Sequence, residues 1–361
     1  MLNGCFLPVR KKVAQMNIVV LAGGLSGERD VSLTSGTLVC NALLRIGHRA
    51  ILVDLFFGVE TVPDNILDAF DVSGQLEPYR VPEKAPDIDK IRAMRSDSGY
   101  GEIGKNVIEL CRVADIVFMA LHGETGENGK LQAVFDVMGI KYTGTGYLGS
   151  ALAMHKNVSK QIFDQIGVKN PKGRLYNKAD KDRIAEEFPL PCIVKPNAGG
   201  SSIGVTKAAT KAELKAAVDE AFRYEDEVIV EQFISGRELT CGVLGDKALP
   251  PAEIVPKGSF YDYTHKYQDG WITEICPAQI PDVITKQMQE SALKVFSALH
   301  LEIYARMDYI YDEKTGELYC LEANTLPGLT PTSHMPQEAK AAGISYEQLC
   351  EQIIRLSLER F

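Results

Sequence analysis

The feature that most constrains this fold is a pair of segments near the C-terminus, residues 304–312 (YARMDYIYD) and 317–323 (ELYCLEA). Both are rich in aromatic and β-branched residues, which favour β-strands. Between them, residues 314–316 (KTG) have the composition of a three-residue hairpin loop with glycine at its left-handed position. We therefore predict an antiparallel hairpin in which residue 313 opposes residue 317.

This register gathers four polar side chains on one face of the hairpin. Asp308 opposes Glu322 and Arg306 opposes Asn324, and alternate residues of one strand share a face, so the four side chains lie together. The opposite face is predicted to be buried in a core. It carries Met307, Tyr309, Tyr311, Tyr319, Leu321 and Ala323.

The four polar side chains predict a metal site. Oxygen ligands from Asp308, Glu322 and Asn324, without His or Cys, suit a hard cation such as Mg²⁺. Arg306 beside them indicates negative charge that develops during a reaction. The alternative is a solvated polar face on an edge hairpin, and a slip of one residue in the register would place Asp308 and Glu322 on opposite faces.

Composition narrows the class of protein. A chain of 361 residues exceeds what a single hydrophobic core usually supports, so we expect two or three domains. The net charge of -9 argues against broad binding to nucleic acid or anionic membranes, and no apolar stretch approaches the roughly 18 residues of a membrane helix. The eight cysteines include no C-x-x-C pair and are predicted to be buried thiols of a cytoplasmic protein. The N-terminus lacks a signal-peptide pattern.

The N-terminal part predicts a parallel α/β domain. An apolar strand, Asn17 to Ala22, runs into a glycine-rich turn and a helix, and further buried strands are expected at Ile51 to Leu55 and Ile116 to Leu121. Such a turn can cradle a phosphate or carboxylate, but GGLSG lacks the G-x-G-x-x-G spacing of a dinucleotide site. Loop content places the first domain boundary near Thr143, and Asp71 to Gly104 is interpreted as an insertion or mobile loop.

A second candidate site lies in the middle of the chain. Lys195 ends a predicted strand that runs into Gly199 to Gly204 (GGSSIG), a loop with unhindered N–H groups and hydroxyls beside a positive charge. We expect this loop to close over phosphates, with an ordinary hairpin turn as the alternative. His122, at the end of the third strand, is equally compatible with a structural and a catalytic role. Helices are predicted at residues 213–224 and 284–299, twice within 335–358, and in a segment that contains Lys156.

Five motifs occur in a characteristic order: GGLSGERDVSLTSG, HGETGENGKLQ, VKPNAGGSSIG, FYDYTHKY, and RMDYI followed by LEANTLPGLTPTS. In this order and spacing, nearly the whole chain resembles the ATP-grasp superfamily and, within it, the D-alanine:D-alanine ligases. The resemblance implies an α/β fold, α+β in parts, with a Rossmann-like substrate domain at residues 1–143 and a two-lobed ATP-grasp unit after it. The central lobe with the phosphate loop would cover residues 144–230, and the C-terminal lobe with the metal and substrate site residues 231–361.

The resemblance also implies roles for individual residues. Those implied to bind ATP are Lys156 and Lys195 at the phosphates, Gly199, Gly200, Ser201 and Ser202 in the loop above them, Glu231 and Ile234 beside adenine, Glu238 at the ribose, and Phe260. Asp308, Glu322 and Asn324 match the ligands of two Mg²⁺ or Mn²⁺ ions. Those implied to bind the amino acids or to catalyse their ligation are Glu28 with Ser201 and Tyr267 at the first ammonium, Lys266 and Ser333 at the second carboxylate, and Arg306 with Gly328 at the tetrahedral intermediate. His122 is also implied to bind substrate.

The implied reaction joins two D-alanine molecules through an acyl phosphate, with ATP as cosubstrate, for peptidoglycan precursor synthesis in a bacterial cytoplasm. Many relatives are homodimers, and no nucleic-acid or membrane partner is expected. Tyr267 favours an amino acid as the second substrate. His334 is expected beside the second substrate and leaves the specificity of that site open. The alternatives are a ligase that joins D-alanine to D-serine or D-lactate, a non-catalytic ATP-grasp nucleotide-binding protein, and an NAD-binding dehydrogenase.

Overall fold

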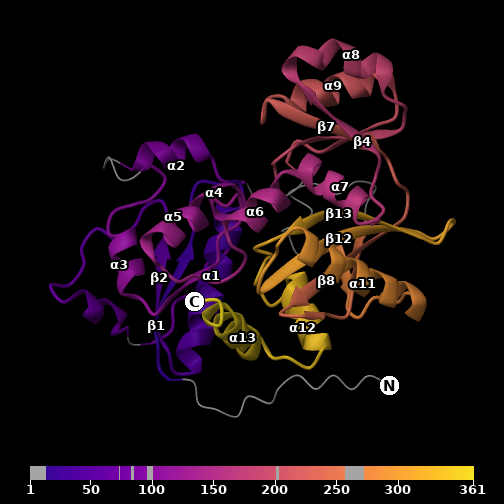
Figure 1. Ribbon diagram of the computed structural model, residues 1–361. Coiled ribbons are helices and arrows are strands. Elements are labelled where there is room, and N and C mark those ends of the chain that lie inside the picture. Colours follow the sequence, from indigo (N-terminus) through magenta and orange to yellow (C-terminus); the bar gives the residue numbers. More distant parts are fainter. Residues whose placement is uncertain (1–13, 73, 83–84, 96–100, 201–202, 257–271) are drawn as a thin grey trace.

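The computed structural model describes residues 14–361, apart from residues 73, 83–84, 96–100, 201–202 and 257–271. Its elements form three bodies, each built on its own β-sheet (Figure 1). The N-terminal body, in indigo and purple, lies on one side. Two further bodies, in magenta to salmon and in orange to yellow, lie one above the other on the opposite side.

The first sheet is parallel, as the sequence predicted. β1 (Asn17–Ala22) pairs with both β2 (Arg49–Asp54) and β3 (Ile116–Met119). All four residues of β3 and five of the six in β1 are buried, as expected for strands covered on both faces. α1 (Arg29–Arg45) follows the glycine turn and packs on β1 and β2. The other helices of this body are η1 (Ile66–Phe70), α2 (Ile88–Met94), α3 (Val107–Val113), α4 (Glu124–Glu127) and α5 (Lys130–Met138).

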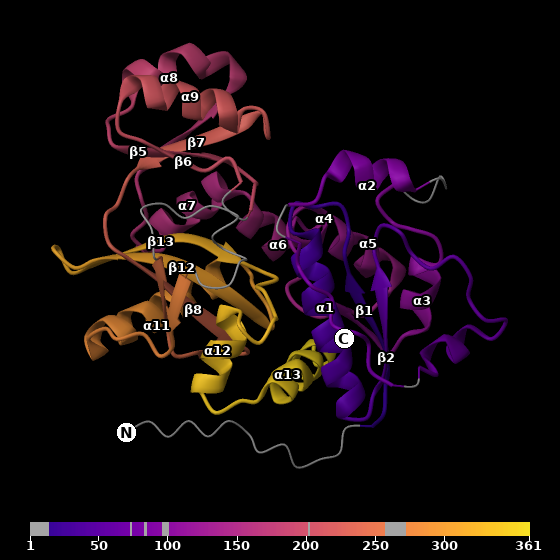
Figure 2. The ribbon, with the colours of Figure 1, turned by 180° about the vertical axis from the view of Figure 1, so that it is seen from behind.

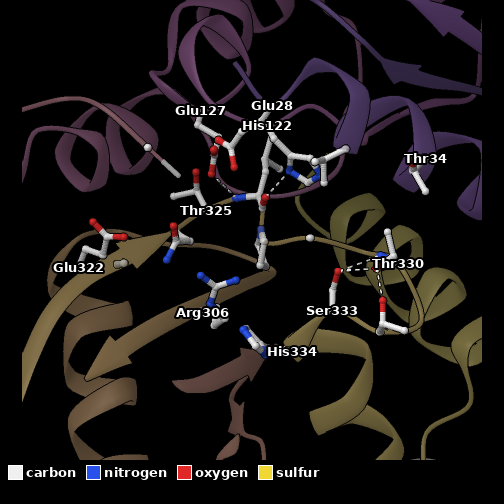
Figure 3. A pocket seen from close by; sticks show the side chains of 18 of the residues that line it. Glu28, Thr34, His122, Glu127, Arg306, Glu322, Thr325, Thr330, Ser333 and His334 are labelled. Atoms are coloured by element: carbon white, nitrogen blue, oxygen red, sulfur yellow. Dashed lines mark hydrogen bonds between the residues drawn. The ribbon is translucent and has the colours of Figure 1, made fainter. Parts of the chain in front are cut away.

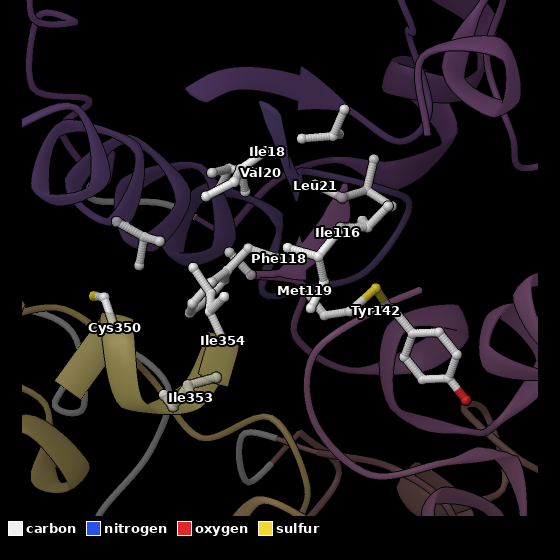
Figure 4. Packing of buried hydrophobic residues seen from close by; sticks show 14 of the residues in the cluster. Ile18, Val20, Leu21, Ile116, Phe118, Met119, Tyr142, Cys350, Ile353 and Ile354 are labelled. Carbon is white, nitrogen blue, oxygen red and sulfur yellow. The ribbon is translucent and has the colours of Figure 1, made fainter. Parts of the chain in front are cut away.

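The last helix, α13 (Tyr346–Leu358), also belongs to the core of the first sheet. Its Ile353 and Ile354 pack toward Phe118 of β3 (Figure 4). A buried hydrogen bond adds to this contact, because His48 Nε2 lies 2.9 Å from the Glu351 carboxylate. Seen from behind, α13 lies between α1 and the C-terminal body (Figure 2). The last helix of the chain therefore completes the core of the N-terminal body.

Two residues in the described part of residues 71–104, Leu76 and Tyr79, are hydrogen-bonded to α1. Tyr79 donates a hydrogen bond to Asp30 at 2.7 Å, and the backbone of Leu76 exchanges hydrogen bonds of 2.7 and 2.9 Å with the side chain of Asn41. The segment also contains α2. The expected loop is thus held against α1 at two points.

The second sheet is antiparallel and has the order β4-β7-β5-β6. Its strands are β4 (Gly173–Asn177), β5 (Cys192–Pro196), β6 (Thr206–Ala208) and β7 (Glu227–Gln232), and its helices are η2 (Lys178–Asp180), α8 (Lys181–Glu187) and α9 (Lys211–Ala221). The predicted helix that contains Lys156 is confirmed, but the loop expected before it contains another helix. Two helices are present, α6 (Tyr147–Met154) and α7 (Lys156–Gln165), because the side chain of His155 caps the second by accepting from the Val158 N–H.

The third sheet carries the predicted hairpin, and its path runs β11-β10-β8-β12-β13, with β9 paired to β8. The strands are β8 (Arg237–Leu244), β9 (Lys247–Ala248), β10 (Ala252–Pro256), β11 (Ile272–Ile275), β12 (Tyr304–Asp312) and β13 (Glu317–Asn324). α11 (Asp282–Ala298) packs on the core side of β8, β12 and β13, and α12 (His334–Ala341) packs on β8 and β10. β12 is therefore an interior strand.

The predicted register at the site is confirmed, although the predicted loop is wrong. Arg306 opposes Asn324 and Asp308 opposes Glu322, but Asp312, not residue 313, opposes Glu317. The loop is one residue longer than predicted, and a β-bulge after Asp308 restores the register.

The bulge also corrects the predicted core face. Met307, Tyr309, Tyr311 and Ala323 are buried in the core as expected, and Cys320 takes the place predicted for its neighbours. Tyr319 and Leu321 are only partly buried, since the extra residue shifts every β13 residue between the bulge and the loop to the other face.

The three sheets support a proposed division into three domains. The second proposed boundary, between residues 230 and 231, falls inside β7, and α13 at the end of the third proposed domain packs on the first.

The cysteines of the described chain are unpaired, and six of the seven are buried. Among the helices that the structure describes, none combines the length and apolar character needed to cross a membrane.

Candidate active site

A cavity of 680 Å³ is lined by residues from several elements that are far apart in the sequence. Figure 3 shows Glu28, His122 and Glu127 reaching it from the N-terminal body, with Arg306 and His334 on the opposite wall. The predicted site residues on its wall are Glu28, His122, Lys156, Gly199, Gly200, Arg306, Glu322, Asn324, Gly328 and Ser333. Lys195, Glu231, Ile234, Glu238 and Asp308 are described but do not line it, and Ser201, Ser202, Phe260, Lys266 and Tyr267 lie outside the described residues.

Arg306 and Asp308 form a bidentate ion pair on β12. The guanidinium Nε and Nη2 each donate to one carboxylate oxygen of Asp308 at 2.8 Å, and the Asn324 amide donates to Asp308 at 3.0 Å. This planar pairing fixes the guanidinium in direction. Arg306 is only 8% exposed and faces the cavity, so its charge acts where little water screens it.

The oxygen-bearing side chains on this face fit a hard divalent cation. Asp308, Glu322 and Asn324 offer two carboxylates and an amide oxygen from directly opposed or alternate positions. Within the described chain, no group of three or more His, Cys, Asp and Glu side chains gathers as a metal centre. The candidate site therefore depends on its amide and on oxygen atoms from a ligand, which is typical of Mg²⁺ bound with phosphates.

Lys156 joins the hairpin to the predicted phosphate loop. It begins α7, its ammonium donates to the carbonyl oxygen of Gly199, and it lies 3.5 Å from the Glu322 carboxylate. Its side chain is 9% exposed. A buried ammonium next to both the loop and a predicted metal ligand is well placed to contact a phosphate.

Glu231 lies between two lysines. Lys195 and Lys160 approach its carboxylate at 2.7 and 2.8 Å, and all three side chains are buried. Burial alone would raise the pKa of Glu231, but the two ammonium groups outweigh burial and lower it. Lys160 was missed in the sequence because a lysine on a helix is ordinarily exposed. In this arrangement the positive charge of Lys195 is balanced by Glu231.

Glu28 lies against two glycines that the sequence placed in separate motifs. A Cβ atom at Gly123 would lie 3.1 Å from Oε2 of Glu28, and one at Gly200 would lie 3.2 Å from it. The glycines thus let the turn after β3 and the predicted phosphate loop approach the carboxylate closely. This places an acidic group where the N-terminal body meets the loop.

His122 and Glu127 hold the backbone of Leu326 between them. The carbonyl oxygen of Leu326 is 2.9 Å from His122 Nδ1, so Nδ1 carries the proton and Nε2 accepts from Ser35. Glu127 accepts from the N–H groups of Gly123 at 2.6 Å and Leu326 at 3.1 Å. Sequence reasoning missed Glu127, although it lies in the HGETGENGKLQ motif.

The environment of Glu127 favours its neutral form. Burial, and to a smaller extent the charge of Glu28, raise the pKa of Glu127 from 4.5 to about 7, against the two backbone hydrogen bonds. The carboxyl therefore titrates near neutral pH at a contact between the N-terminal body and the segment after β13.

The far end of the cavity is formed by the start of α12. Ser333 precedes the helix, and its hydroxyl bonds to Thr330, while a Cβ at Gly328 would lie 2.8 Å from that hydroxyl. The next residue, His334, approaches the Glu274 carboxylate of β11 at 3.2 Å. Glu274 was missed because its strand follows the residues that carry the FYDYTHKY motif and has no pattern of its own.

A fully buried carboxyl lies behind Arg306. Glu338 of α12 has no exposed surface and accepts from the Gly242 N–H of β8 at 2.7 Å. Burial raises the pKa of Glu338 from 4.5 to about 8, and the charge of Arg306 opposes this shift. Gly242 is required here, because a Cβ would lie 2.4 Å from the Glu338 carboxylate.

Comparison with known proteins connects this geometry to one family. Family models described as the N-terminus and the C-terminus of D-ala D-ala ligase match residues 17–145 and 157–355. A D-alanine–D-alanine ligase from Pediococcus pentosaceus is 44% identical over 341 residues, which cover 94% of this chain and 97% of that protein.

Solved structures agree over the same length. The D-alanine–D-alanine ligase from Bacillus anthracis complexed with ATP has a TM-score of 0.72 at 28% identity, covering 96% of this chain and 98% of that one. The VanG D-Ala:D-Ser ligase from Enterococcus faecalis has a TM-score of 0.72 at 32% identity, covering 95% and 99%. The chain belongs to the D-alanine–D-alanine ligase family.

Proposed function

We propose that this protein joins two D-alanine molecules to D-alanyl-D-alanine with ATP as cosubstrate, releasing ADP and phosphate. The observation that carries this is the common face of β12 and β13, where Arg306, Asp308, Glu322 and Asn324 lie together beside the cavity that Glu28 borders from the opposite side. The full-length relationship to ligases of this name supports the same reaction.

Charge explains why the reaction has two steps. An amine does not displace an oxygen of a carboxylate directly, because the anion repels the nucleophile and has no good leaving group. Transfer of the terminal phosphoryl group of ATP to one carboxylate oxygen of the first D-alanine gives an acyl phosphate and ADP. The neutral amine of the second D-alanine then attacks the carbonyl carbon and forms the C–N bond. The C–O bond to phosphate breaks, phosphate leaves with its electron pair, and the nitrogen loses a proton.

The residues of the cavity supply the electrostatics of these steps. Glu28 is assigned to the ammonium of the first D-alanine, since its carboxylate borders the cavity beside the phosphate loop. Arg306, fixed by Asp308, stabilises the oxyanion, a contribution usually worth about 3 to 4 kcal/mol per donor. Lys156 exchanges its present partners for phosphate oxygens.

The proposed metal ligands are Asp308, Glu322 and Asn324, which would hold two Mg²⁺ or Mn²⁺ ions. Such ions offset the negative charge of the ATP phosphates when bound. The remaining ATP contacts proposed from the family are those of Lys195, the loop at Gly199 and Gly200, and Glu231, Ile234 and Glu238 near the nucleoside.

We also infer that the protein is a homodimer that acts in a bacterial cytoplasm, supplying a peptidoglycan precursor. The packed helices α5 and α6 expose apolar side chains, with Val137 90% exposed and Tyr147 and Leu148 about half exposed. A second copy of the chain would cover this surface. Sedimentation equilibrium tests the inference, and a Val137→Glu variant is expected to be monomeric if this surface is the interface.

The test of the proposed function is ADP release with D-alanine, L-alanine, D-serine and D-lactate offered in turn, with the product identified by mass. We expect release with D-alanine and a dipeptide of two alanines. The VanG relative makes D-serine the second candidate acceptor, and a product from D-alanine and D-serine would establish it. ADP release that does not depend on any of these acids would overturn the proposal.

A further inference from the structure

Three polar side chains contact one another on the cavity wall, which we call the acceptor wall: Glu274, His334 and Gln337. His334 Nδ1 lies 3.2 Å from one oxygen of the Glu274 carboxylate, and the Gln337 amide donates to the other oxygen. Gln337 also donates to the Thr332 carbonyl oxygen at 2.6 Å. Glu274 is therefore held by a hydrogen bond from Gln337 at one oxygen, and its other oxygen lies close to the His334 ring.

The acceptor wall lies next to the position proposed for the second substrate. Its three residues line the same cavity as Ser333 and Arg306, and His334 directly follows Ser333 in the chain. The side chains of His334 and Glu274 are 9% and 22% exposed. Because both side chains are largely buried, water screens a charge at this position less than it would at the surface.

A carboxylate on this wall distinguishes the two classes of acceptor. An amino acid binds as a zwitterion with no net charge, whereas a 2-hydroxy acid such as D-lactate carries one negative charge and no ammonium. Both present a carboxylate to the same groups. The amino acid binds with its ammonium attracted to the Glu274 anion and loses a proton before its amine attacks, whereas the hydroxy acid has no group that gains from this charge.

We propose that Glu274, oriented by His334 and Gln337, is a specificity-determining residue that favours an amino acid over a hydroxy acid as the second substrate. This inference rests on the proposed function and deepens it. It assigns the choice of acceptor to a charge on β11, in addition to any contribution from Tyr267.

The experiment compares three variants with the wild-type protein. Glu274→Gln removes the charge with little change of shape, and Glu274→Asp keeps the charge. Glu290→Gln makes the same change in net charge on the exposed side of α11, outside the cavity. For each protein, the inhibition constant of D-lactate is divided by the KM for D-alanine as acceptor, and thermal unfolding verifies the fold.

We expect Glu274→Gln to lower this ratio by about tenfold, as loss of a single charge a few ångströms from the ammonium would do. Glu274→Asp and Glu290→Gln should stay near the wild-type ratio. An equal ratio in Glu274→Gln and Glu290→Gln would overturn the inference, and so would an equal drop in the Gln and Asp variants, which would assign the effect to shape. Failure of the wild-type protein to form a dipeptide is a separate result that refutes the proposed function instead.

Discussion

Glu127 accepts a hydrogen bond from the backbone N–H of Leu326, a residue 199 positions further along the chain, at 3.1 Å. The carbonyl oxygen of the same residue bonds to His122. A turn of the N-terminal body thus holds both polar groups of Leu326 in the segment that runs from Asn324 to Gly328. The position of Gly328, which is expected to contact the tetrahedral intermediate, therefore depends on the contact between two bodies.

Replacing Glu127 with Gln is expected to lower kcat/KM for D-alanine by about tenfold. A glutamine has one accepting oxygen, so one of the N–H groups of Gly123 and Leu326 loses its partner, which ordinarily costs about 1 to 3 kcal/mol. Initial rates of ADP release measure the effect. Glu124→Gln, on the exposed side of the same turn, is the matched control. Equal rates in the two variants would show that the contact does not position the site.

The buried Glu338 predicts how stability depends on pH. Its pKa is raised from 4.5 to about 8 in the folded protein, so the folded state binds a proton more tightly than the unfolded state does. The stabilisation from the protonated carboxyl is present below pH 4.5 and is lost as pH rises from 4.5 to 8. Glu127, with a pKa of about 7, contributes in the same direction up to pH 7.

Glu338→Gln should flatten this dependence, because an amide does not ionise and its oxygen still accepts from Gly242. Urea unfolding at pH 5 and pH 8 measures it. The free energy of unfolding of the wild-type protein should fall between these pH values by more than that of the variant. The same fall in both proteins would assign the pH dependence to other groups.

Asp308→Asn is expected to reduce ligation by about a hundredfold or more and to raise the Mg²⁺ concentration that supports half-maximal ADP release. The change removes one of two carboxylates from the proposed metal site while leaving one accepting oxygen for Arg306. A magnesium titration of the initial rate is the measurement, and Asp312→Asn, at the loop end of the same strand, is the control. A magnesium requirement equal to that of the control would remove Asp308 from the set of ligands.

Arg306→Ala is expected to slow ligation by about a hundredfold to a thousandfold and to lower stability, with the secondary structure intact. The loss of one oxyanion donor usually lowers the rate by about a hundredfold to a thousandfold. Because the variant leaves the carboxylate of Asp308 without its main partner, the free energy of unfolding should fall by about 3 kcal/mol. Circular dichroism and urea unfolding report the fold, and ADP release reports the chemistry. Wild-type turnover in this variant would contradict the assignment.

For the hairpin at residues 304–324, the local sequence predicts the strand pairing but not the details of the loop. The opposition of Asp308 and Glu322 was predicted from a three-residue loop, whereas the structure combines a four-residue loop with a bulge after Asp308. The longer loop and the bulge each shift the register by one residue, in opposite directions. The pairing at the site is therefore as predicted, whereas the core face differs at Tyr319 and Leu321. Local sequence predicts that two strands pair, but loop length and bulges depend on packing against α11 and β8.

What the sequence by itself determined is the set of local elements and the polar groups they carry, because alternation, glycine turns and apolar spacing act within a few residues. The parallel first sheet, the strands around Lys195 and the pairing of the two hairpin strands all follow from such patterns. Only the tertiary structure decided which distant groups meet: α13 on the first sheet, Glu127 on Leu326, and Glu274 on α12. Those contacts join distant segments through apolar packing, hydrogen bonds and charged side chains, and local patterns do not specify which distant partner each group meets.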